Sequence, residues 1–180
     1  MFWTAWAVLI VATGLSAAAS FLSYAKGRRA SIRTWITLVA AVLALASLIL
    51  GLVGHAVHES ESVPAVLSIS LSVLFALAFG GPFTELVFTM ASRAPKPPAK
   101  EKSDPSPLRG GLWIGLLERA AIVGTLWAGW PEGTAVVLAV KGLGRFAELK
   151  NHQAAEQFIL GTFASGLVAA GAYGLGLLLS

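Results

Sequence analysis

Seven charged side chains lie inside or beside segments that are otherwise apolar enough to cross a membrane. They are four acids and three bases: Glu85, Glu118, Glu148 and Glu156, with Arg119, Lys141 and Arg145. A charge at the centre of a membrane helix costs about 2.5–3.5 kcal/mol on insertion scales, so it is retained where partners or water compensate it. Because the two signs nearly balance, the sequence predicts an intramembrane charged cluster.

The residue types in this cluster are compatible with four roles. The acids and bases can pair and fix helix packing. They can line a pathway for an ion, a proton or a small polar solute, with Glu118 as a gate or proton carrier in the field of Lys141 and Arg145. The three bases can bind an anionic lipid headgroup or a phosphate, because the planar guanidinium of Arg119 offers two parallel hydrogen bonds. The fourth role is catalysis.

Catalysis is the role that the sequence supports least. The chain contains no nucleophile elbow, no His-Glu-x-x-His motif and no phosphate-cradling glycine loop. It also contains no cysteine, which excludes disulfides and thiolate ligands. His55 and His58 share a helical face, but only two glutamates follow them, so we predict no metal site. We therefore expect a protein that is not an enzyme and needs no cofactor.

The spacing of the charges predicts one specific ion pair. Two apolar runs are joined by the short turn Pro131-Glu132-Gly133, so their helices should be antiparallel neighbours. Glu118 lies about 13 residues before this turn and Arg145 about 12 after it, at similar depth for a rise of 1.5 Å per residue. We expect these two to pair. The side chain of Arg119 points about 100° around the helix from that of Glu118, so Arg119 needs another acid as its partner. The candidates are Glu85 and Glu156.

Composition shows what kind of protein must hold these charges. Of the 180 residues, 56% are hydrophobic and 12% are charged, and the mean hydropathy is +0.76. Soluble domains carry about 25% charged residues, so this chain is membrane-like. The net charge is +4, but the basic residues sit largely in short loops. There they face anionic lipid headgroups, and we expect no nucleic-acid partner.

Six apolar runs predict an all-α polytopic bundle, since a bilayer core takes roughly 20 helical residues. The runs cover 2–24, 32–57, 64–90, 110–130, 134–149 and 155–179. Within the third run, Gly80-Gly81-Pro82 predicts a kink or a break just before Glu85. The loops after the first, third and fifth runs contain Lys or Arg, and the other two contain neither. This asymmetry places both termini outside.

A proline-rich and lysine-rich segment divides the chain. It covers 93–109 and contains five prolines, which predicts an extended, solvated cytoplasmic linker. It separates a three-span amino-terminal half, 1–92, from a three-span carboxyl-terminal half, 110–180, that carries most of the charged cluster. The halves show no sequence repeat, so an inverted-repeat transporter is unsupported.

Small residues recur along the last apolar run and predict close helix packing. Gly166, Ala170 and Gly174 repeat every four residues. Small side chains at this spacing let helix backbones approach, within one chain or between two copies. Packing within one chain is the commoner case, and a homo-oligomer or a partner membrane subunit remains open. On an adjacent face, Gly161, Ser165 and Ala169 nearly repeat this spacing, and Thr162 is a further predicted packing residue.

Three motifs in the second half occur in a fixed order. They are Gly-x-x-Ile-Gly-x-x-Glu-Arg over 111–119, Lys-x-x-x-Arg-Phe-x-Glu over 141–148, and Gly-Thr-x-x-Ser over 161–165. In this order they resemble a family of bacterial multi-span integral membrane proteins of uncharacterised function. The resemblance covers roughly the last 70 residues. It implies a multi-pass protein of the bacterial inner membrane with a polar cluster, and it implies no reaction.

Overall fold

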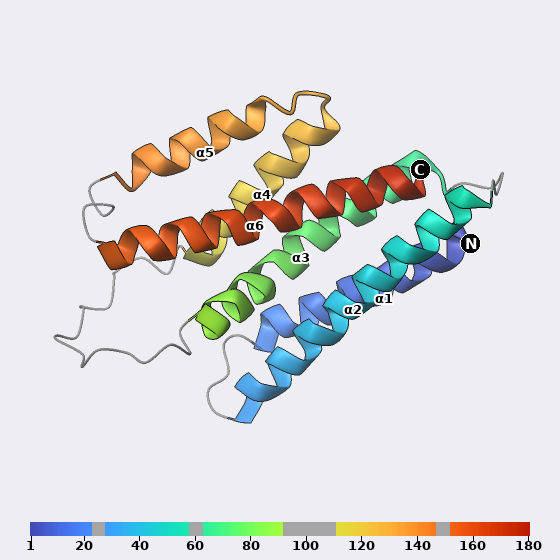
Figure 1. The fold of residues 1–180 in the computed structure, drawn as a ribbon, viewed down its shortest axis with the longest axis horizontal. Coiled ribbons are helices and arrows are strands. Elements are labelled where there is room, and N and C mark those ends of the chain that lie inside the picture. The colour runs from blue at the N-terminus through green and yellow to red at the C-terminus, as the bar shows by residue number, and fades with distance from the viewer. Residues whose placement is uncertain (23–27, 58–62, 92–110, 147–151) are drawn as a thin grey trace.

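The described part of the chain consists of helices and the turns that join them. The computed structural model describes residues 1–22, 28–57, 63–91, 111–146 and 152–180, and no strand occurs among them. Six helices follow one another in Figure 1: α1 Phe2–Leu22, α2 Arg28–Ala56, α3 Ala65–Ala91, α4 Gly111–Trp127, α5 Gly133–Gly144 and α6 His152–Leu179. The prediction of an all-α helix bundle is confirmed. The predicted linker, 93–109, lies outside the described residues.

Four of the six helices are long and apolar enough to cross a membrane. They comprise Phe2–Phe21, Ser31–Ala56, Ala65–Ala91 and Ala154–Leu179. The other two are shorter, since α4 has 17 residues and α5 has 12. At 1.5 Å per residue they reach about 25 Å and about 18 Å, less than the roughly 30 Å of a hydrocarbon core. The six predicted runs therefore correspond to four helices of spanning length and one shorter helical hairpin.

The boundaries of α4 and α5 have local causes. After α4, the chain turns at Gly129, whose φ of 70° lies in the left-handed region that glycine adopts without strain. At the other end of the hairpin, α5 finishes in Gly142-Leu-Gly144, where Arg145 leaves helical geometry and its N–H bonds back to the Gly142 carbonyl. Both runs were predicted to be several residues longer.

The helices form an antiparallel bundle with both termini at one end (Figure 1). The α1–α2 hairpin lies beside α3, and α3 packs along α6 in the opposite direction. At the end that holds the termini, the N–H of Val63 donates to the carbonyl of Leu179 at 3.1 Å. A chain that crosses the membrane an even number of times ends on the side where it began. The position of both termini at one end of the bundle agrees with this. The side of the membrane stays a prediction.

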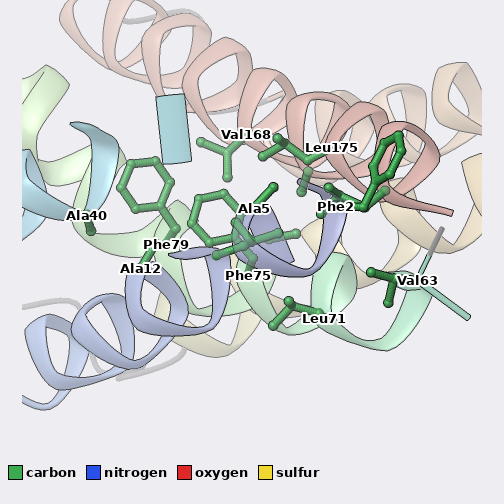
Figure 2. Packing of buried hydrophobic residues seen from close by; sticks show 14 residues of the cluster. Phe2, Ala5, Ala12, Ala40, Val63, Leu71, Phe75, Phe79, Val168 and Leu175 are labelled. Carbon is green, nitrogen blue, oxygen red and sulfur yellow. The ribbon is translucent and has the colours of Figure 1, made fainter. Parts of the chain in front are cut away.

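One hydrophobic core joins the two halves of the chain. Figure 2 shows side chains of α1, α3 and α6 converging, with Phe75 and Phe79 of α3 at the centre. Their rings stack with centroids 5.0 Å apart. On α6, Val168 and Leu175 close the core from the carboxyl-terminal half. The core therefore packs α3 of the amino-terminal half against α6 of the carboxyl-terminal half.

The helix α3 continues through Pro82, so of the predicted kink or break, the break does not occur. Proline has no N–H, which leaves the carbonyl of Ala78, one turn earlier, without its helical donor. The hydroxyl of Ser20 on α1 donates to this carbonyl at 3.0 Å. A neighbouring helix thus satisfies the group that proline exposes, as is common for proline in membrane helices.

The face of α6 that packs is not the one that Gly166, Ala170 and Gly174 form. Ala170 and Gly174 are exposed, and a Cβ added at Gly166 or Gly174 would meet nothing within 4 Å. A Cβ at Gly176 would lie 2.9 Å from Ser72 of α3, and one at Gly161 would lie 3.2 Å from the Phe88 ring. The predicted contact of the 166–170–174 ridge with another helix is therefore wrong within the described chain.

The reason is the angular position of the ridge. A helix turns by 100° per residue, so Gly166 lies about 100° around α6 from the buried Ser165, and the ridge that starts at Gly166 lies beside the packed face. The buried positions of α6 instead alternate steps of three and four: Ser165, Val168, Ala172, Leu175 and Leu179. Gly161 lies four residues before Ser165 and extends this stripe. The second predicted face is therefore the one in contact with α3.

Two glycines of α6 provide a matched test of this packing. We expect Gly176→Ala to lower the unfolding free energy by about 1–3 kcal/mol, because the new methyl overlaps Trp127 and Ser72. Gly174→Ala should be neutral or slightly stabilising, since alanine favours helix and the site is open. Thermal unfolding in detergent, followed by tryptophan fluorescence, measures both. Equal effects at the two positions would contradict the packing described for α6.

Candidate functional site

Neighbouring residues of α4 direct two charges to different sides of the helix. Glu118 faces α5, and Arg119 faces α3 and α6. The two side chains diverge because adjacent helical residues are about 100° apart. Together they connect α4 to each of the helices that surround it.

Glu118 pairs with Lys141 of α5. The Nζ of Lys141 lies 2.5 Å from Oε2 of Glu118, and the two side chains are only 16% and 14% exposed. The same ammonium group lies 5.7 Å from the centroid of the Phe158 ring on α6, within cation–π range. This pair therefore joins α4 to α5, and its ammonium group also reaches a side chain of α6.

The predicted partner of Glu118 is wrong, because Arg145 lies one turn beyond Lys141, exposed at the end of α5. The error comes from where the count began. Helix α4 ends at Trp127 and α5 begins at Gly133. Residues at the same depth therefore lie about nine positions before Trp127 and about eight positions after Gly133. Those positions are Glu118 and Lys141.

Arg119 is buried in a slot lined by glycine. Its residue exposure is 5%. A Cβ at Gly80 of α3 would lie 2.6 Å from the Arg119 Nε, and one at Gly115 would lie 3.3 Å from Nη1. From α6, the Ser165 hydroxyl accepts a hydrogen bond from Nη1 at 3.4 Å. The absence of side chains at two glycines is what allows a guanidinium between these helices.

The slot lies at mid-height in the bundle. Ser165 is near the centre of α6, which covers His152–Leu179, and Gly80 is near the centre of α3, which covers Ala65–Ala91. A fixed positive charge at this depth is costly without compensation. Both helices that border Arg119 are of spanning length, and the charge lies near their middle rather than at an end of the bundle.

Neither predicted acid reaches Arg119. Glu85 pairs instead with Arg33 of α2, whose Nη1 lies 3.0 Å from the carboxylate Oε2. Glu156 is exposed on α6. Among the residues that the structure describes, no carboxylate lies within ion-pair distance of Arg119. Glu148 lies outside the described residues.

The predicted single cluster is therefore three separate groups in the described chain. One is the Glu118–Lys141 pair, another is the Arg33–Glu85 pair, and the third is the buried Arg119 with Ser165. Thr162, one turn before Ser165, has a buried hydroxyl oxygen without a hydrogen-bond partner in the described structure.

The three ordered motifs of the second half meet at these groups. The Glu of the first motif contacts the Lys of the second, and the Arg of the first contacts the Ser of the third. Within the described ranges, no group of three or more His, Cys, Asp or Glu side chains is placed to hold a metal ion. The ring of His55 packs edge-on against Phe2.

The fold and its four apolar helices indicate an integral membrane protein. Comparison of the chain with protein-family models, with curated proteins and with solved structures gives no match.

Proposed function

We propose that this chain is a non-catalytic integral membrane protein of a bacterial inner membrane, acting as a structural or accessory subunit. Its ion pairs would fix the relative positions of helices. The observation that carries this proposal is that both ion pairs of the described chain join different helices. Arg33 and Glu85 join α2 to α3, and Glu118 and Lys141 join α4 to α5.

The α4–α5 hairpin supports an accessory role. Helix α5 packs mainly on α4, and its apolar side chains remain largely exposed, including Val136, Val140 and Leu143. The Glu118–Lys141 pair joins the two helices of this short hairpin. A hairpin held in this way offers an apolar surface to lipid or to a partner membrane subunit without any change in the four-helix core.

A pathway for an ion, a proton or a small solute has weaker support. Such a pathway needs ionisable groups in a continuous line across the membrane. Glu85 faces α2, whereas Glu118 faces α5, so the two paired acids lie on different helix contacts. Each acid also has a base as its direct partner, which favours a structural role over proton transfer.

Flux measurements distinguish these functions. We expect vesicles reconstituted with wild-type protein to pass protons, potassium and chloride no faster than protein-free vesicles. The double variant Glu118→Gln with Lys141→Gln should behave identically. A matched control is Arg33→Gln with Glu85→Gln, which removes the other pair. Wild-type flux that the first double variant abolishes and the second retains would refute the structural proposal and establish a pathway at α4 and α5.

A further inference from the structure

We propose that Arg119 binds an oxyanion, a carboxylate or a phosphate, inside the helix bundle. Glu118, Arg119 and Lys141 lie at similar depth. The one acid among them, Glu118, forms its ion pair with Lys141. One positive charge is left in excess, and no other acid of the described chain is within ion-pair distance of it. Buried charges in proteins are paired or coordinated, so this guanidinium requires an anionic partner.

The hydrogen-bonding groups around Arg119 lead to the same inference. A guanidinium has five N–H donors. In the described structure Nη1 makes one long bond to Ser165, and the buried Nε makes none. The buried hydroxyl of Thr162, one turn away on the same helix, is also without a partner. A buried polar group without a partner is costly, so the unpaired Nε of this buried charge and the unpaired Thr162 hydroxyl, one turn from Ser165, indicate a ligand.

The chemistry of these groups selects an oxyanion. The planar fork of arginine matches the paired oxygens of a carboxylate or a phosphate, and two parallel bonds are stronger and more specific than one. The backbones of Gly80 on α3 and Gly115 on α4 border the guanidinium. From α6, the hydroxyls of Thr162 and Ser165 can donate to the remaining oxygens. The ligand is therefore a small oxyanion or the phosphate of an anionic lipid, which share this chemistry.

Thermal unfolding of the purified protein in nonionic detergent tests the proposal. Three additions are compared at matched ionic strength: sodium phosphate, sodium acetate and sodium chloride. A parallel series uses mixed micelles with phosphatidylglycerol or phosphatidylcholine. We expect a saturable rise of several degrees in the unfolding midpoint with an oxyanion or with phosphatidylglycerol. A rise with phosphate or acetate identifies a free oxyanion, and a rise with phosphatidylglycerol alone identifies a lipid headgroup.

Variants show whether the response belongs to Arg119. Arg119→Lys keeps the charge but removes the fork, so the response should disappear. Thr162→Val is nearly isosteric and should weaken the apparent affinity at least tenfold, which keeps the test valid where Arg119→Lys does not fold. Arg33→Lys changes an arginine elsewhere and should retain the full response. No response in the wild type, or an equal response in wild type and Thr162→Val, would overturn the proposal.

Discussion

Replacement of Glu118 by glutamine is expected to lower the unfolding free energy by about 3–5 kcal/mol. Breaking a buried ion pair by removing one partner leaves the other charge without compensation, which is the costly case. Here the ammonium group of Lys141 would remain between α4 and α5, with its side chain 16% exposed. The nearby ring of Phe158 offsets only part of this cost, since cation–π contacts contribute about 0.5–2 kcal/mol.

The double variant Glu118→Gln with Lys141→Gln should recover much of that loss, because no charge is then stranded. A double-mutant cycle from thermal unfolding in detergent gives the coupling between the two residues. Glu156→Gln is the matched control, because Glu156 is exposed on α6 and the change should be nearly neutral. A Glu118→Gln protein as stable as Glu156→Gln, or a double variant no more stable than Glu118→Gln, would show that the pair does not stabilise the hairpin.

The sequence predicted the number of helices and their order, because long apolar runs separated by polar loops have few other solutions in a membrane. It did not predict the lengths of α4 and α5. Those helices end where Gly129 adopts positive φ and where Gly142 and Gly144 weaken the helix, and glycine within an apolar run is equally compatible with continued helix. Local conformation at a few glycines therefore decided which runs reach spanning length.

The charged residues could be identified from the sequence, but not their partners. A charge within an apolar run is visible from composition alone, as for Glu118 and Arg119. Which base faces Glu118 depends on the residues at which the hairpin helices end, and an error of a few residues shifted the prediction from Lys141 to Arg145. Arg33 was not predicted as the partner of Glu85, although its place near the start of α2 puts it beside Glu85 of α3.

The role of Gly80 could not be inferred before the structure. Its position next to Gly81 and Pro82 indicated a kink, which is a property of α3 alone. The structure gives it a tertiary role, since Arg119 of α4 occupies the space that a side chain at Gly80 would fill. Contacts between segments distant in sequence, such as this one and the bond from Arg119 to Ser165, have no local signature.

Gly80→Ala is therefore expected to destabilise the protein by about 3 kcal/mol, at the upper end of the range for overpacking. The added methyl would overlap the Cδ of Arg119 and lie 2.6 Å from Nε. The side chain has little freedom to move away, because it is buried and Gly115 borders it on the other side. Displacement of the guanidinium would also break its hydrogen bond to Ser165.

The adjacent glycine is the control for this change. A Cβ at Gly81 would lie 3.9 Å from Nη2 of Arg119, an ordinary van der Waals contact. Gly81→Ala should therefore be tolerated, and the higher helix propensity of alanine can add up to about 1 kcal/mol. Thermal unfolding midpoints of both variants in detergent measure the difference. If both variants unfold at the same temperature as wild type, Arg119 does not occupy a fixed slot against α3, and the position of its guanidinium described above is wrong.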